Sequence, residues 1–159
     1  MRGQISIEYI AIVAFILFAT VPVLYYATQK SNEDIRLSEA DTATESMRSL
    51  VNKVYSLGKG TRDFTTVNFP SGIQDILVGG PTGQANPNEF IMKLGIFGST
   101  NDIVKTTIAP SICLKLDNAQ QPIQLPKGKG TYRIFAEYVD RTTPNICKIE
   151  LSCGTDSCT

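Results

Sequence analysis

The sequence of 159 residues contains no histidine. This absence removes the commonest general base near neutral pH and the commonest ligand of catalytic metals. An excess of charge of either sign is also missing, because fifteen Lys and Arg side chains balance fifteen Asp and Glu side chains. A balanced chain sets up no field that would draw it to nucleic acid. We therefore expect no enzyme activity, no catalytic residue, no metal, no cofactor and no nucleic-acid partner.

Hydrophobic side chains gather near the N-terminus instead. Residues 9–27 form an apolar run that only Thr20 and Pro22 interrupt. A helix needs about 20 such residues to cross roughly 30 Å of hydrocarbon. A buried core helix explains the run less well, since the run is too long and is apolar on every side. The pattern predicts a single-pass membrane precursor that contacts lipid at some stage.

The residues before this run have an unusual order. An ordinary secretory signal is cut after its apolar region, next to small residues. Here a small residue, Gly3, precedes the region, and the bulky Tyr25 stands two positions before Ala27. Glu8 places a carboxylate at the start of the membrane segment, which is costly unless the carboxylate reaches the interface or a partner. Headgroup depth and pairing with a positive charge in a helical bundle both explain Glu8.

Gly3 followed by Gln4-x-Ser6-x-Glu8 and an apolar run resembles the archaeal type IV pilin-like precursors that carry a class III signal peptide. Their hallmark is a short basic leader ending in Gly, then Q-x-S-x-E and a hydrophobic stretch. The match covers only the N-terminal segment. Ile12 stands where the family usually has Leu, which is a mild departure.

The resemblance implies that a prepilin peptidase cuts between Gly3 and Gln4. Gln4, Ser6 and Glu8 would then serve assembly, with the new α-amino group at Gln4 neutralising Glu8 of a neighbouring subunit unless Gln4 cyclises. The implied partners are copies of the same chain, the peptidase and the membrane platform that assembles pili. The implied function is a pilin in an extracellular surface filament that supports adhesion. Alternatives are a minor pilin, a membrane-anchored extracellular binding domain, and an archaellum filament subunit.

A second helical pattern follows the apolar run. Pro22 predicts a kink or a locally unwound turn. Beyond it, hydrophobic residues recur at spacings of three and four, which is typical of one helix face packed on a sheet. The glycines at 58 and 60 predict the end of the helix. The members of this face are Ala40, Ala43, Met47, Leu50, Val54 and Leu57.

The remainder of the chain reads as short strands separated by turn residues. We expect a leader over 1–3, an apolar helix over 4–28, its amphipathic continuation over 29–58, and an extracellular β-rich domain over 59–159. Together they predict an α+β fold, a long N-terminal helix packed on a C-terminal antiparallel sheet or β-sandwich as in type IV pilins. The candidate strands are 64–69, 73–78, 89–97, 103–108, 112–116, 122–125, 131–139 and 146–151.

All four cysteines lie beyond the membrane segment, in the last third of the chain. An even number of cysteines in a non-cytosolic domain is typical of disulfides. Zinc is less favoured, because closed zinc sites usually have tighter spacing on both sides. Three pairings are open, of which we favour Cys113 with Cys147 and Cys153 with Cys158.

Overall fold

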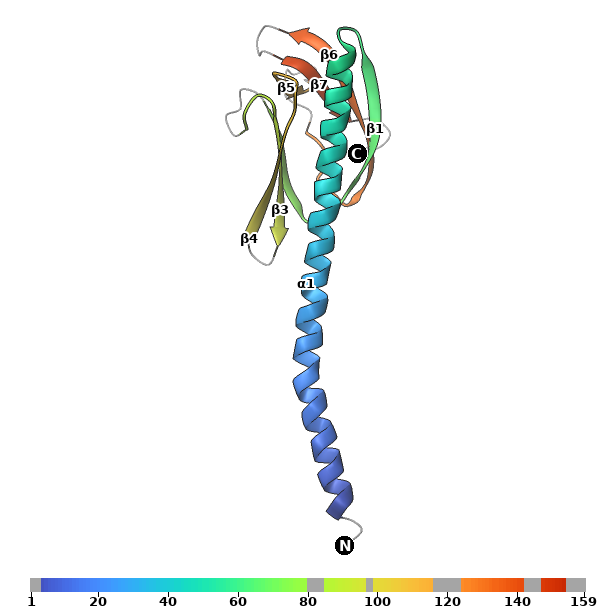
Figure 1. Cartoon of the computed structure of the whole chain (residues 1–159), viewed down its shortest axis with the longest axis vertical. Helices are drawn as coiled ribbons and strands as arrows, with labels where there is room; N and C mark the ends of the chain where they lie inside the picture. Colours follow the sequence, from blue (N-terminus) through green and yellow to red (C-terminus); the bar gives the residue numbers. More distant parts are fainter. Residues whose placement is uncertain (1–3, 80–84, 97–98, 116–123, 142–146, 154–159) are drawn as a thin grey trace. The chain divides into compact units, whose positions relative to one another are not determined.

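The computed structural model describes residues 4–79, 85–96, 99–115, 124–141 and 147–153 (Figure 1). The side chains of residues 4–6, 141 and 147 also lie outside this described part. The chain consists of two units, Met1–Ile35 and Arg36–Thr159. All described residues of the first unit are helical, and the second unit contains the rest of the helix and every described strand.

One helix, α1, runs from Gln4 to Leu57. It continues through Pro22, so no turn is unwound there, and the kink at Pro22 stays a prediction. The helix ends at the predicted glycines, because Gly58 has a φ of 87° that few other residues adopt without strain. The Gly58 amide donates to the carbonyl oxygens of Val54 and Tyr55, each at 3.2 Å, which satisfies carbonyls at the end of the helix.

The strands form two sheets. One sheet has the order β1-β6-β7-β5 and the other has the order β2-β3-β4. Neighbouring strands are antiparallel except β5 and β7, which are parallel. The α+β class is therefore correct, but the first sheet is mixed rather than antiparallel, because strand order places β5 beside a strand of its own direction. The strands are β1 (Arg62–Phe69), β2 (Ile73–Val78), β3 (Glu89–Ile96), β4 (Ser99–Thr106), β5 (Ile112–Leu114), β6 (Gly130–Arg141) and β7 (Cys147–Cys153).

The largest differences from the predicted strands concern two of them, and β1, β5, β6 and β7 differ from their predicted bounds by one or two residues at their ends. β4 begins at Ser99 rather than at 103 and ends at Thr106 rather than at 108. The predicted strand over 122–125 lies partly outside the described residues, and its described part is not in a strand. Leu125 is nevertheless buried, so a hydrophobic residue of a loop contributes to the core.

One hydrophobic core joins α1 to both sheets. Five of the six residues on the predicted helix face belong to it, and Leu57 does not, because its side chain is 64% exposed at the end of the helix. Val51, which the pattern did not include, is fully buried. β3 contributes alternate residues, as a half-buried strand does. The largest fully buried side chains are Phe69, Phe90, Met47, Met92, Leu94, Ile112, Ile134, Ile149 and Leu151.

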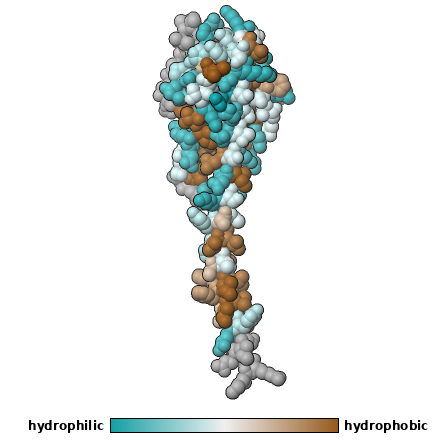
Figure 2. Space-filling model, in the orientation of Figure 1, coloured by the Kyte–Doolittle hydropathy of each residue, from teal (hydrophilic) through white to brown (hydrophobic). Residues whose placement is uncertain are grey.

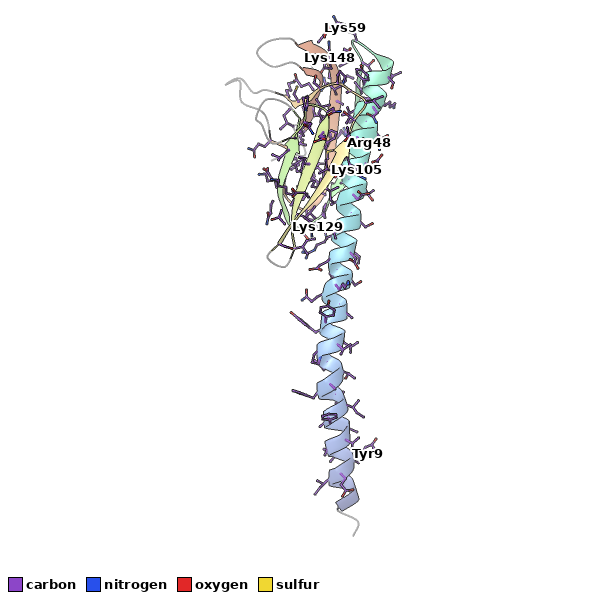
Figure 3. The ribbon with its side chains drawn as sticks, turned by 60° about the vertical axis from the view of Figure 1, so that its left-hand side comes forward. Tyr9, Arg48, Lys59, Lys105, Lys129 and Lys148 are labelled. Carbon is purple, nitrogen blue, oxygen red and sulfur yellow. The ribbon has the colours of Figure 1, made fainter. Side chains whose placement is uncertain are left out.

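Helix α1 also covers the outer edge of β4. The Arg48 Nε donates to the Thr106 carbonyl oxygen at 2.8 Å, and the Asn52 Oδ1 accepts from the Ile108 amide at 3.0 Å. The Lys105 Nζ lies 2.7 Å from the Asp41 carboxylate on α1. Figure 3 shows Arg48 and Lys105 close together where the helix passes β4. The Arg48 bond satisfies a backbone carbonyl at the end of β4, and the Asn52 bond satisfies a backbone amide two residues beyond the strand.

Candidate functional site

The first part of α1 exposes a large apolar surface. Ile7, Phe15 and Phe18 are 71%, 74% and 81% exposed. The most hydrophobic window of the helix has a mean hydropathy of 2.3, and none of its residues is buried. Figure 2 shows this part of the helix in the hydrophobic colour. In the described part of the chain, α1 is the one helix that is long enough and apolar enough to cross a membrane.

The core of the second unit does not use this apolar segment. Every described residue that belongs to the core or packs against it lies at Leu37 or later in the chain. The large hydrophobic side chains of residues 7–26 are all exposed instead. Exposed apolar patches of this size mark sites that contact lipid or protein.

Tyrosines stand at both ends of the apolar segment. Tyr9 is 69% exposed (Figure 3). Tyr25 and Tyr26 are 66% and 69% exposed. At about 1.5 Å per residue, Tyr9 and Tyr25 are separated by roughly 24 Å along the helix. Tyrosines prefer the two interfaces of a bilayer, because the ring is apolar and the hydroxyl is polar. This pair of tyrosines was not predicted, although its spacing is visible in the sequence.

The predicted assembly residues lie around the first turns of α1. Glu8 has an exposed side chain and directly precedes Tyr9, so it falls at the same end of the apolar segment as that tyrosine. Gln4 is the first residue of the helix. Gly3 and the side chains of Gln4 and Ser6 lie outside the described residues, so their arrangement around Glu8 stays a prediction.

Glu33 lies where the helix has become polar. Its Oε1 atom is shielded from solvent and has no hydrogen-bond donor, and it is the one buried side-chain oxygen or nitrogen without a partner among the described residues. Buried polar atoms normally have a partner, so an unsatisfied one asks for an explanation.

Two of the four cysteines are described with their side chains. Cys113 and Cys153 are both disulfide-bonded. Cys158 and the side chain of Cys147 lie outside the described residues, so the pairing of Cys113 with Cys147 and of Cys153 with Cys158 stays a prediction.

Ion pairs in the second unit link surface elements to each other. A hydrogen bond from Lys53 lowers the pKa of Asp63, and the two side chains approach to 2.6 Å between α1 and β1. On the other side of the helix, a hydrogen bond with Asp41 raises the pKa of Lys105. Both pairs favour the charged forms and hold the helix beside edge strands. Among the residues the structure describes, no group of three or more Asp, Glu or Cys side chains is placed to hold a metal ion.

Comparisons with protein-family models, with curated proteins and with solved structures find no match for this chain. Its function is therefore inferred from the N-terminal motif, the exposed apolar helix and the fold.

Proposed function

We propose that this protein is a structural subunit of an archaeal type IV-like pilus that supports surface adhesion. The observation that carries the proposal is the exposed apolar segment of α1, which the core of the second unit does not need. Such a segment requires an apolar environment outside the chain. Lipid supplies it in the precursor, and the helices of neighbouring copies supply it in the filament.

The proposed maturation explains the residues at the start of the helix. A prepilin peptidase cuts between Gly3 and Gln4, and the membrane assembly platform moves the subunit from lipid into the filament. Because lipid is as apolar as a leucine side chain, close packing rather than hydrophobicity must favour the helix bundle. Glu8 and the new amino group at Gln4 would pair between copies. Because desolvation offsets much of their attraction, this pair would contribute to the axial register of the copies more than to the stability of the filament.

The second candidate is a membrane-anchored subunit that stays in the bilayer, either a minor pilin or an extracellular binding domain. The tyrosines at both ends of the apolar segment favour it, because their spacing suits a helix that spans the hydrocarbon. This candidate needs no contact between copies. It predicts a protein that remains in the membrane fraction when filaments are sheared from cells.

The test is the N-terminus of the protein in sheared surface filaments and in membranes, measured by mass spectrometry. A filament-forming pilin should begin at Gln4 and dominate the sheared fraction. Gly3→Lys should abolish both cutting and filaments, whereas Arg2→Lys, which keeps the leader basic, should leave both unchanged. A filament fraction whose chain still begins at Met1, or a product that begins beyond residue 27, contradicts the proposal. A cut chain that is found only in membranes supports the second candidate.

A further inference from the structure

The outer face of the four-stranded sheet carries two phenylalanines that are each covered by an arginine. Alternate residues of β1 and β6 are buried in the core, so the residues between them form this outer face. Phe64 on β1 lies directly opposite Phe135 on β6, and their ring centres are 5.6 Å apart. The guanidinium carbon of Arg133 lies 5.0 Å from the centre of the Phe64 ring. Arg62 covers Phe135 at the same distance from the other strand.

The two arginines differ in what lies opposite them. Arg62 faces Glu137 across the strand pair, and its Nε atom is 3.9 Å from the carboxylate. Arg133 faces Thr66 instead. Within the described part of the chain, Arg133 forms no ion pair and no hydrogen bond, and its contact is with the Phe64 ring. The arrangement therefore provides a carboxylate for one arginine and leaves the other without one.

The carboxylates on the two strands near Arg133 are already paired. On β1 the one carboxylate is Asp63, which approaches Lys53 to 2.6 Å. Along β6 the next carboxylate is Glu137, which pairs with an arginine and lies four residues from Arg133, roughly 13 Å along the strand. Lys129, directly before β6, is exposed and has no ion pair among the described residues. This end of the strand pair therefore carries unpaired positive charge, although the chain as a whole is neutral.

Hydrogen-bonding side chains and an exposed ring lie beside Arg133. Asn68 lies opposite Thr131, whose hydroxyl donates to the Asn68 Oδ1 at 3.5 Å. The amide hydrogens of the Asn68 side chain and the hydroxyl of Thr66 have no hydrogen-bond partner in the described part. Phe64 is 50% exposed, although it contacts two other side chains. The surface therefore combines a cation, hydrogen-bonding groups and an apolar ring.

We infer that this surface, which we call the Arg133 face, binds an acidic carbohydrate whose sugar rings carry carboxylates. A guanidinium that rests on an aromatic ring keeps its N–H edge free for the two oxygens of a carboxylate. The C–H face of a sugar packs against the exposed part of Phe64, because its hydrogens are slightly positive and the face of the ring is negative. The sugar hydroxyls bond to Thr66 and Asn68. The members of the face are Phe64, Thr66, Asn68, Thr131 and Arg133.

The spacing of these groups favours a sugar over an acidic peptide. Side chains opposite each other on paired strands are about 5 Å apart, which is comparable with the width of one sugar ring. A uronic acid residue holds its carboxylate, its apolar face and its hydroxyls rigidly within that width. A Glu or Asp side chain supplies the carboxylate alone, and ordering it costs free energy. This inference does not depend on whether the protein forms filaments.

The test uses the full isotope-labelled chain in zwitterionic detergent micelles and the probe trigalacturonic acid, with binding followed by NMR chemical shifts. Saturable shifts of the Thr66, Asn68 and Arg133 signals are expected. Arg133→Gln should weaken binding by about 3- to 10-fold, as the loss of an exposed charge-assisted contact does. The matched control Arg62→Gln removes the same charge from the same sheet face and from the same kind of ring. It should bind within about twofold of the wild type, because Arg62 is already paired with Glu137.

A second measurement does not require any variant to fold. Galactotriose has the rings and hydroxyls of the probe without its carboxylates, so it should bind at least about threefold more weakly. Equal binding of galactotriose, or an absence of saturable shifts, would overturn the inference. Equal weakening by Arg133→Gln and Arg62→Gln would also overturn it, because the net charge of the face would then explain binding. If acetyl-Glu-Glu-Glu-amide binds as tightly as trigalacturonic acid, the face recognises an acidic protein segment, and the choice of a carbohydrate is wrong.

Discussion

Two phenylalanines of α1 and β1 allow a direct test of whether the apolar segment belongs to the fold. Phe69 is fully buried and its ring lies 5.5 Å from that of Tyr132, whereas Phe18 is 81% exposed. Phe69→Ala removes a buried ring and should lower the free energy of unfolding by about 3–5 kcal/mol. Because small domains are stable by only about 5–15 kcal/mol, this change is large. Phe18→Ala is the same substitution at an exposed position and should change the free energy of unfolding by less than about 0.5 kcal/mol.

The measurement is urea unfolding of the full chain in detergent micelles, followed by the near-UV circular dichroism of the tyrosines packed against the core. With a slope of about 1–3 kcal/mol per molar urea, Phe69→Ala should lower the midpoint by at least about 1 M. Phe18→Ala should leave the midpoint unchanged while reducing the amount of assembled filament. If Phe18→Ala lowers the midpoint as much as Phe69→Ala does, the apolar segment is part of the folded core, and the reason for proposing an assembly helix is lost.

Three further predictions concern the second unit. Gly58→Ala should lower the free energy of unfolding by about 1–2 kcal/mol, because the φ of 87° is unfavourable for alanine. Steric contact is not the reason, since the added carbon would meet no neighbouring atom within 4 Å. Gly58→Asn should lower the free energy of unfolding by less, and equal effects of the two substitutions would contradict the backbone explanation. Reducing the disulfides of Cys113 and Cys153 should lower the free energy of unfolding by about 2–5 kcal/mol in a urea titration, and an unchanged midpoint would contradict it. The hydrogen bond from Lys53 lowers the pKa of Asp63 in the folded state below 3.8. The contribution of this ion pair to the free energy of unfolding is therefore present above that pH, and it is lost as the pH falls through the folded pKa of Asp63. Urea midpoints measured against pH should therefore fall less steeply on acidification in Asp63→Asn than in the wild type.

Much of the fold follows from hydrophobic spacing. The strand predicted over 73–78 has the observed bounds of β2, because its buried residues and its flanking turn residues are both visible in the sequence. β3 alternates cleanly between buried and half-buried residues, and it too was predicted to within one residue at its end. The glycines at 58 and 60 marked the end of α1 correctly, because the chain adopts a positive φ at both positions and glycine is the residue that adopts it most easily.

The missed features are those that hydrophobic spacing does not encode. The first four residues of β4, 99–102, are polar and exposed, since this strand lies at the edge of its sheet, so the pattern suggested a later start. The parallel pairing of β5 with β7 depends on strand order across distant parts of the chain. Val51 is buried because the helix contacts both sheets and therefore buries a wider face than the spacing of three and four predicted.

The candidate functional site also contains some features that the sequence predicted and others that it did not. Glu8 and the apolar run were evident from residue order, because a carboxylate before a long hydrophobic stretch is rare. The hollow between β1 and α1, which is lined by Thr42, Ser46 and Phe64, was not predictable from the sequence. It depends on which of two edge strands receives hydrogen bonds from the helix, and a single sequence shows neither the register of β1 nor the distance to α1.

The way α1 packs in the second unit has a mechanical consequence. Its buried residues extend from Ala40 to Val54, and its contacts with β1 and β4 lie along the same stretch. A pull along the helix axis loads these contacts together in shear, so many must yield before any part of the helix slides. Peeling, in which contacts break one after another, would need a force across the axis. A chain tethered through its N-terminal helix would therefore resist tension far better than its modest size suggests.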